Sequence, residues 1–303
     1  MNTKKIKRFV PQKKEKVTTF TVTEESTLME FLSKKMPEKS RTAVKSLFTN
    51  KQVKVNGDAS AKYDSPLKAG DSVVISSMKA PREIPIKGLT IVYEDLDLIV
   101  INKNYGLLSV STNKENEKTA YNILSNYVKQ ADPGNKIFVV HRLDRETSGI
   151  MMFAKNPEAK KYLQSDWHDV VMDRSYYVVV EGKVEDDVGG VHSWLSENKN
   201  FHVFSSQRPN SGQEAITKYK VLKRSRLYSL LEVTLDTGRK NQIRVHMEDL
   251  GHPVVGDQKY GATTNPINRL GLHAFLLSFK HPKTEEVMKF STPIPPEFDH
   301  LFK

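Results

Sequence analysis

The feature that most restricts the fold is a series of short apolar runs between residues 89 and 180, rich in Val, Ile, Leu and Tyr. Each run is four or five residues long, which suits a β-strand better than a helix. The predicted strands are Leu89–Tyr93, Leu98–Ile101, Ile137–Val140, Ile150–Phe153 and Tyr176–Val180. Farther along, Thr217, Tyr219 and Val221 alternate with lysines, which predicts a half-exposed strand.

Helices are predicted between these strands at irregular intervals. Ala120 to Val128 has a helical apolar stripe, and Pro157 follows a capping Asn156. Ile243, Met247 and Leu250 form a further stripe that Gly251 closes. Many strands with irregularly placed helices indicate an α+β fold, in which flanking helices cover a mainly antiparallel mixed sheet.

Changes in composition predict four parts of the chain. Residues 1–16 form a basic tail, expected to be disordered, which serves either solubility or phosphate contact. Residues 17–80 form a small α+β domain, and 81–88, with Pro81 and Pro85, form a linker. Residues 89–303 form the larger domain.

The small domain is predicted to contain two helices followed by a hairpin. Ser26 and Thr27 are candidate caps of the first helix and Ser40 of the second, and Asn56-Gly57 marks a tight turn. The domain resembles an alpha-L-type RNA-binding module, although any helix-plus-hairpin domain with a solvated basic face shares this pattern. Its candidate RNA-binding residues are Lys34, Lys35, Lys39, Arg41, Lys45 and Lys51.

Composition excludes several kinds of chemistry. The absence of cysteine excludes disulfides, thiolate metal sites and a cysteine nucleophile. No two of the nine histidines are three or four residues apart, and no Walker A or dinucleotide-binding glycine pattern occurs. We therefore expect no cofactor and no metal.

The net charge of +11, from 47 basic and 36 acidic residues, favours a polyanionic partner. No apolar stretch is long enough to span a bilayer, and no apolar segment follows the basic amino terminus as in a secretory signal. We expect a cytoplasmic monomer that binds nucleic acid, without a membrane or an obligate protein partner.

The segment His141-Arg142-Leu143-Asp144-Arg145-Glu146-Thr147-Ser148-Gly149 is a charged loop between two predicted strands. Function often lies on such loops. An arginine within about 4–6 Å of Asp144 would favour its ionised form. An ionised carboxylate can attack an anomeric carbon or stabilise positive charge there. A solvated cluster of charges would have the same composition.

The same nine residues resemble the catalytic signature of the RNA pseudouridine synthases of the large-subunit uridine-A type. The resemblance implies that Asp144 is the catalytic aspartate. Arg174-Ser175-Tyr176 resembles the family's strand with the active-site tyrosine, here Tyr176. The segment from Thr237 to His246 resembles the one whose arginine pairs with the aspartate, here Arg244. Further similar segments include Gly251–Asp257, and the resemblance extends from about residue 89 to 303.

The resemblance also implies the reaction, which converts uridine to pseudouridine without redox change or added atoms. The target nucleotide must leave the RNA stack, and Arg142 is implied to lie near the vacated position. Large-subunit ribosomal RNA is the favoured substrate, and transfer RNA is the alternative. Two other classes remain: a non-catalytic ribosome-associated RNA-binding protein, and a nucleoside or glycoside hydrolase. His141, His246, His252 and His273 are interpreted as structural.

Overall fold

The computed structural model describes residues 17–49, 52–57, 62–76, 84–111, 118–165, 167–209 and 211–303. Two compact units result, Met1–Glu83 and Ile84–Lys303, and their boundary falls inside the predicted linker 81–88. The predicted tail 1–16, residues 81–83 of the linker and Lys51 lie outside the described residues. No helix in the described ranges is long and apolar enough to cross a membrane.

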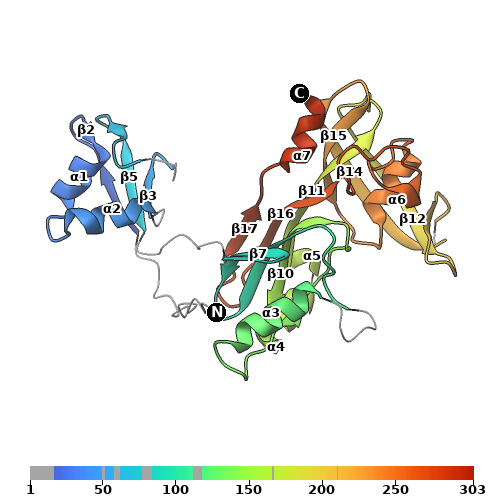
Figure 1. The fold of residues 1–303 in the computed structure, drawn as a ribbon, viewed down its shortest axis with the longest axis horizontal. Coiled ribbons are helices and arrows are strands. Elements are labelled where there is room, and N and C mark those ends of the chain that lie inside the picture. The colour runs from blue at the N-terminus through green and yellow to red at the C-terminus, as the bar shows by residue number, and fades with distance from the viewer. Residues whose placement is uncertain are drawn as a thin grey trace, which may run out of the picture. The chain divides into compact units, whose positions relative to one another are not determined.

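The described residues of the first unit form two helices and two small sheets (Figure 1). The larger sheet is antiparallel, in the order β1-β5-β3, and β2 pairs with β4. The elements of this unit are β1 (Val17–Thr21), β2 (Ser26–Thr27), α1 (Leu28–Lys35), α2 (Arg41–Thr49), β3 (Val53–Val55), β4 (Pro66–Leu67) and β5 (Ser72–Ser76). Of the predicted caps, Thr27 and Ser40 are confirmed: Thr27 and Glu30 form a reciprocal capping box, and the Ser40 hydroxyl accepts from the Ala43 amide. Ser26 lies in β2 and does not cap the helix.

The second unit is built on a mixed sheet that has twelve strands within the described ranges. Its path runs β13-β12-β14-β15-β11-β16-β10-β8-β7-β6, and β17 and β9 pair with β16 and β10. The strands are β6 (Ile84–Ile86), β7 (Leu89–Glu94), β8 (Leu98–Lys103), β9 (Phe138–Val139), β10 (Ser148–Ala154), β11 (Val171–Glu181), β12 (Val188–Glu197), β13 (Val203–Ser206), β14 (Gln213–Arg224), β15 (Tyr228–Leu235), β16 (Leu272–Lys280) and β17 (Val287–Ser291). The pairings are antiparallel except β10 with β16. The predicted α+β class with a mainly antiparallel mixed sheet is confirmed.

Helices cover both faces of the β8–β10 part of the sheet. In β8 (the strand before the first long helix), Ile99 and Ile101 pack on the face of α3 (Ala120–Lys129). Leu98 and Val100 point to the opposite face, which α4 (Pro157–Ser165) and α5 (Trp167–Val170) cover. Because side chains alternate along a strand, a run that is apolar at every position has to be buried on both faces.

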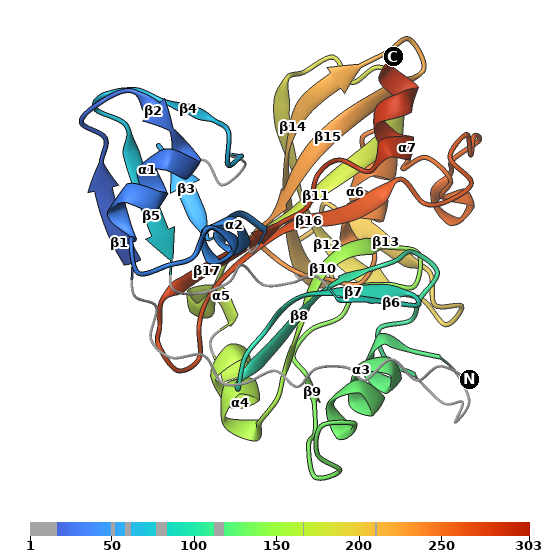
Figure 2. The same cartoon turned by 60° about the vertical axis from the view of Figure 1, so that its left-hand side comes forward.

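The other half of the sheet is covered in the same way (Figure 2). α6 (Gln242–Asp249) packs Ile243 and Met247 against β11 and β15. Phe298 of α7 (Pro296–Asp299) packs with Val179 and Leu230, which face the other side of these strands. Short 3₁₀ turns at Gln258–Tyr260 and His300–Phe302 complete the unit.

One close approach fixes the start of β10. A Cβ atom on Gly149 would lie 2.1 Å from the carbonyl oxygen of Ala274 in β16. The φ angle of Gly149 is 121°, which other residues rarely adopt. Gly149 ends the charged segment singled out in the sequence. Because only glycine fits there, the charged segment can lead directly into β10 at the point where β10 pairs with its parallel neighbour β16.

Candidate active site

The predicted catalytic loop, residues 141–147, connects β9 to β10 in the middle of the sheet. Ser109 holds it from one side, because its hydroxyl donates to the Leu143 carbonyl at 2.6 Å and accepts from the Leu143 amide at 3.1 Å. The Thr147 amide donates to the Asp144 carbonyl at 3.2 Å. Asp144 therefore lies on a short loop whose backbone is bonded on both sides of it.

Lys103 supports the same loop and was not singled out in the sequence. Its side chain is fully buried, and its ammonium donates to the carbonyl oxygens of Asn104, Leu107 and Arg145. The Arg145 carbonyl also accepts from the Gly106 amide at 2.8 Å. Burial lowers the pKa of Lys103 to about 8, although the charge of Asp144 raises it. Lys103 lies two residues beyond the predicted strand Leu98–Ile101, and its sequence position gave no sign of this contact with the loop.

The four predicted residues of the larger domain line one cleft of about 1020 Å³. Asp144 and Arg142 come from the loop, Tyr176 from β11 and Arg244 from the first turn of α6. Residues 237–241, before α6, also line the cleft. Residues from distant parts of the sequence thus meet at one place.

Tyr176 lies beside a bulge, because the register between β11 and β16 shifts between Ser175 and Tyr176. Bulges often redirect a side chain near an active site. Burial raises the pKa of the Tyr176 phenol, while the guanidinium of Arg174 lowers it and the charge of Asp144 raises it. The hydroxyl is therefore neutral at physiological pH and lies within electrostatic range of Asp144.

Arg244 differs from the prediction in its partner. Its Nε and Nη2 donate to the two carboxylate oxygens of Asp257, both at 2.6 Å, and its Nη1 donates to Asn241 at 3.2 Å. The predicted partner, Asp144, acts on the guanidinium through its charge. Burial disfavours the charged form of Arg244, but the bonds and charge of Asp257, with a smaller contribution from Asp144, raise its pKa. The turn 251–257 brings Asp257 to α6, and the family resemblance alone did not reveal this.

Arg174 and Trp167 are cleft residues that were not predicted as site residues. The guanidinium carbon of Arg174 lies 5.6 Å from the centre of the Trp167 ring. On the other side, a Cβ atom on Gly238 would lie 2.6 Å from Arg174 Nη1, so glycine leaves room for this side chain. The position of Arg174, two residues before Tyr176, puts it on the same side of β11 and could have indicated its place in the cleft.

The histidines interpreted as structural are hydrogen-bonded. His246 contacts Ser193 and Thr217, and His273 contacts Ser148 and Thr292. Burial lowers the pKa of both to about 4. His141 Nε2 accepts from the Met152 amide, and burial lowers its pKa to about 3. His252 donates to the Glu181 carbonyl. These bonds support a structural role for each.

In the first unit, the candidate RNA-binding residues lie on or between the two helices. Lys34 forms an exposed ion pair with Glu24, Lys35 lies over the Phe31 ring, and Lys45 lies over the Tyr63 ring. Lys39 and Arg41 are exposed at the loop and at the start of α2. These five side chains are solvated. Their exposure is compatible both with an RNA-binding surface and with a basic surface that only contacts solvent.

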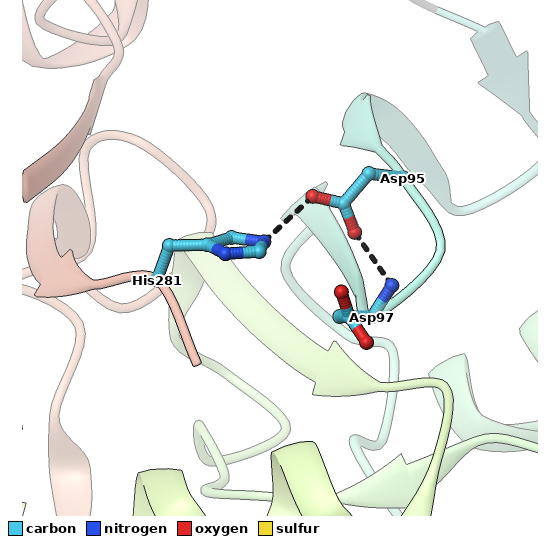
Figure 3. Close-up of side chains that lie close together, drawn as sticks. All are labelled: Asp95, Asp97 and His281. Carbon is cyan, nitrogen blue, oxygen red and sulfur yellow. Dashed lines mark hydrogen bonds and ion pairs between the residues drawn. The ribbon is translucent and has the colours of Figure 1, made fainter. Parts of the chain in front are cut away.

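A possible ligand set for a cation consists of Asp95, Asp97 and His281, and Figure 3 shows His281 pointing to Asp95. The Asp95 carboxylate accepts from His281, from Tyr93 and from two backbone amides, and His281 Nδ1 accepts from the amides of Lys283 and Thr284. Asn156 donates to Asp97. Because these bonds already occupy the polar atoms, the cluster is explained as a junction that ties residue 281 to the β7–β8 turn.

Comparison with known proteins decides the family. The family model for RNA pseudouridylate synthase matches residues 97–249. The chain belongs to this family. It is an RNA pseudouridine synthase, and its activity is an isomerisation. The match begins in the β7–β8 turn and ends with α6, so it contains the loop with Asp144, the strand with Tyr176 and the helix with Arg244.

Curated relatives match most of this pseudouridine synthase. A Bacillus subtilis (strain 168) protein named "Uncharacterized RNA pseudouridine synthase YlyB" is 33% identical over 281 residues, which cover 90% of this chain and 92% of that protein. "Ribosomal large subunit pseudouridine synthase D" of Haemophilus ducreyi (strain 35000HP / ATCC 700724) is 30% identical over 292 residues, covering 90% and 88%. The solved structure "Human RNA Pseudouridylate Synthase Domain Containing 4" shares the fold, with a TM-score of 0.57 and 24% identity over 69% of this chain and 90% of that chain.

Proposed function

We propose that this enzyme isomerises specific uridines in structured RNA, with Asp144 as its catalytic carboxylate. The bond between N1 of uracil and C1′ of ribose breaks, the uracil turns, and a bond from C5 to C1′ forms. C5 loses a proton and N1 gains one, so that no atom is added overall. Asp144 either attacks C1′ or stabilises the positive charge that develops there.

The observation that carries this proposal is the meeting of Asp144, Tyr176, Arg244 and Arg142 in one cleft. The charge of Asp144 affects the pKa of both Tyr176 and Arg244, so the three groups lie within electrostatic range of one another. Arg244, fixed by Asp257, would place a positive charge within electrostatic range of the Asp144 carboxylate. Tyr176, neutral and half-buried in the wall of the cleft, would pack on the uracil and take part in proton transfer at the turned base.

A stacked uridine does not present C1′ to a carboxylate, so the target nucleotide has to be flipped into the cleft. Flipping costs a few kcal/mol in general. Arg142 is exposed, lines the cleft and lies two residues before Asp144, which suits a side chain that occupies the position vacated by the base. Its guanidinium can stack on neighbouring bases and offset part of that cost.

Large-subunit ribosomal RNA is the substrate that we propose. Similar proteins are named ribosomal large subunit pseudouridine synthases, including the Haemophilus ducreyi relative described above. The first unit, residues 17–80 in our proposed division, would anchor the enzyme on structured RNA through its basic face, with 81–88 as the linker and 89–303 as the catalytic domain. Such a substrate implies action in the cytoplasm, and the proposal needs no partner protein.

The experiment compares three variants on an unmodified transcript of large-subunit ribosomal RNA, with pseudouridines mapped at nucleotide resolution. Asp144→Asn is expected to give no product while keeping fold and RNA affinity. Glu146→Gln is the matched control, because Glu146 is an exposed carboxylate two residues away that does not line the cleft. Tyr176→Phe is expected to lose most activity, and full activity would leave only ring packing as its role.

Three results would each contradict a part of the proposal. Substantial product from Asp144→Asn would remove Asp144 as the catalytic residue. Product on transfer RNA transcripts but not on ribosomal RNA would keep the chemistry and change the substrate. Free uracil in the reaction mixture would instead indicate hydrolysis.

A further inference from the structure

Phe201 is a large apolar side chain held in solvent at the edge of the active-site cleft. It lies in the turn between β12 and β13, lines the cleft, and is 70% exposed. Its neighbours in the turn are polar, Lys199, Asn200 and His202. A single ring in a polar, charged setting does not form the contiguous apolar patch that a protein partner would need.

The backbone at Phe201 is in a conformation that does not favour phenylalanine. Its φ is 57°, in the left-handed region, where glycine and asparagine are the usual residues. Asn200, which tolerates this conformation better, occupies the preceding position. An exposed ring on an unfavourable backbone buries little apolar surface for the fold, which points to a ligand outside the folded chain.

The turn that carries Phe201 is tightly bonded. The Phe201 amide donates to the Asn198 carbonyl at 3.0 Å, and the Asn198 amide donates to the His202 carbonyl at 2.9 Å. The Asn198 side chain accepts from the amides of Asn200 and His202, and Lys259 donates to the Phe201 carbonyl at 2.7 Å. These bonds limit the positions that the ring can take.

Tyr260 connects this turn to the catalytic machinery. Its hydroxyl accepts from the Val203 amide at 3.2 Å and from the Asn241 side chain at 3.0 Å. Asn241 in turn accepts from Arg244, whose guanidinium carbon lies 4.8 Å from the centre of the Tyr260 ring. The His202 ring packs on the other part of Tyr260, with 4.9 Å between ring centres. The place of Phe201 is thereby set relative to Arg244.

Basic side chains lie on the segments next to Phe201. Lys240 Nζ lies 5.5 Å from the centre of the Phe201 ring and also pairs with Glu197. Arg239 and Lys240 line the same cleft as Phe201, and Lys259 bonds to the turn. An aromatic ring beside basic side chains suits a nucleotide, because the base can stack on the ring and the basic side chains can neutralise the phosphate of the RNA backbone.

We propose that Phe201 is a stacking platform for an unpaired nucleobase next to the target uridine. The proposal rests on the proposed function for the identity of the ligand as RNA. Flipping one nucleotide removes stacking from its neighbours, and a ring fixed at the rim of the cleft would replace it for one of them. Phe201 then contributes to substrate affinity and to the choice of flanking sequence, and Asp144 contributes to the chemical step.

The first test uses a fluorescent oligouridylate of about eight nucleotides, within the usual range of single-strand binding sites, and the full chain. Phe201→Asn is expected to weaken binding roughly 5- to 150-fold, which corresponds to the ~1–3 kcal/mol of one stacked base. Asparagine suits the left-handed backbone, so the melting temperature should stay equal or rise. Because no charge is removed, the slope of log affinity against log salt should not change, whereas Lys240→Gln should reduce it by about 0.7.

Two further variants separate stacking from other effects. Phe201→Leu keeps an apolar side chain without an aromatic face and should bind as weakly as Phe201→Asn. Phe201→Trp should bind at least as well as the wild type, with RNA quenching the added fluorescence. Phe204→Ala is the matched control, since Phe204 is also exposed, at 46%, but does not line the cleft. It should bind like the wild type.

Turnover on the ribosomal RNA transcript separates this proposal from the proposed function. Phe201→Asn should raise KM and leave kcat nearly unchanged. Wild-type affinity of Phe201→Asn or Phe201→Leu for oligouridylate, or an unquenched Phe201→Trp, would overturn the platform. Binding that depends on Phe201 in a protein that forms no pseudouridine would instead contradict the proposed function and leave the platform standing.

Discussion

Arg244 and Asp257 form an ion pair through two hydrogen bonds of 2.6 Å, and only 15% of the arginine side chain and 1% of the aspartate side chain are exposed. The fork geometry holds the guanidinium in a fixed plane, which a lysine cannot reproduce. Asp144 lies within the electrostatic range of a cation that is already fixed by another carboxylate. The position of Arg244 is therefore fixed by Asp257, and its positive charge can influence Asp144 without a direct ion pair to hold it in place.

Arg244→Lys is expected to lower single-turnover pseudouridine formation by about 10²- to 10³-fold, the typical loss when a fixed electrostatic group is removed from an active site. Asp257→Asn should also lower the free energy of unfolding by roughly 3–5 kcal/mol, because it leaves a buried guanidinium without its counter-charge. Lys218→Gln breaks an exposed pair with Asp236 and serves as control, with little change in either quantity. Near-normal turnover by Arg244→Lys would show that the fork geometry is unimportant.

The sequence predicted the members of the site better than their contacts. Asp144, Tyr176, Arg244 and Arg142 were selected from a family resemblance and line one cleft. The sequence did not predict that Arg244 pairs with Asp257, because Asp257 follows a turn whose path depends on packing between α6 and β11. Contacts of this kind join segments that are distant in sequence, so the local sequence pattern does not predict them.

Lys103 illustrates the same limit and leads to a second prediction. Lys103→Met should lower the free energy of unfolding by about 1–3 kcal/mol, because buried carbonyl oxygens lose their donor. It should also slow turnover, since the Arg145 carbonyl is part of the loop with Asp144. Lys155→Met is the matched control: Lys155 is a half-buried lysine paired with Glu94 and does not contact the loop. If both variants lost stability but kept kcat, Lys103 would have no positioning role.

The fold was predictable where one strand is apolar throughout. The runs that became β8 and β10 were recognised because burial on both faces leaves no polar interruption within them. β16 was not predicted as a strand, although it lies between β10 and β11 at the centre of the sheet. β12 was also missed, since Gly189, Gly190 and His192 interrupt its apolar alternation.

A third prediction concerns pH. Burial lowers the pKa of His246 and of His273 to about 4, whereas histidine in an unfolded chain titrates near 6.5. Between these values the unfolded state binds more protons than the folded state. The free energy of unfolding should therefore be highest above pH ~6.5 and fall as the pH drops toward about 4. Urea unfolding at a series of pH values measures this decline.

His246→Gln isolates one contribution to that decline. Glutamine can still bond to Ser193 or Thr217 but does not titrate, so the variant should lose less stability than the wild type between pH 7 and 5. Exposed His300→Gln is the control and should follow the wild-type curve. Parallel curves for His246→Gln and the wild type would mean that His246 does not remain neutral in the folded protein.

The last prediction tests the two units separately. Each unit has its own hydrophobic core: Leu28, Leu32 and Val44 belong to that of the first, and the clusters around β8, β10, β11 and β15 to the second. A chain that begins at Ile84 keeps all of β6 and every cleft residue. We therefore expect it to fold alone and to keep its kcat at saturating ribosomal RNA.

The same shortened chain should bind RNA more weakly and with a smaller dependence on salt, because fewer phosphates are neutralised. For single-stranded segments the slope of log affinity against log salt should fall by about 0.7 for each phosphate that is no longer neutralised. A full-length variant with glutamine at Lys34, Lys35, Lys39, Arg41 and Lys45 is the matched comparison, since it removes charge and keeps the unit. If both proteins show the same reduced slope, the basic face accounts for the effect of the whole unit. Unchanged affinity, slope and modification sites in the shortened chain would contradict a role of the first unit in anchoring RNA.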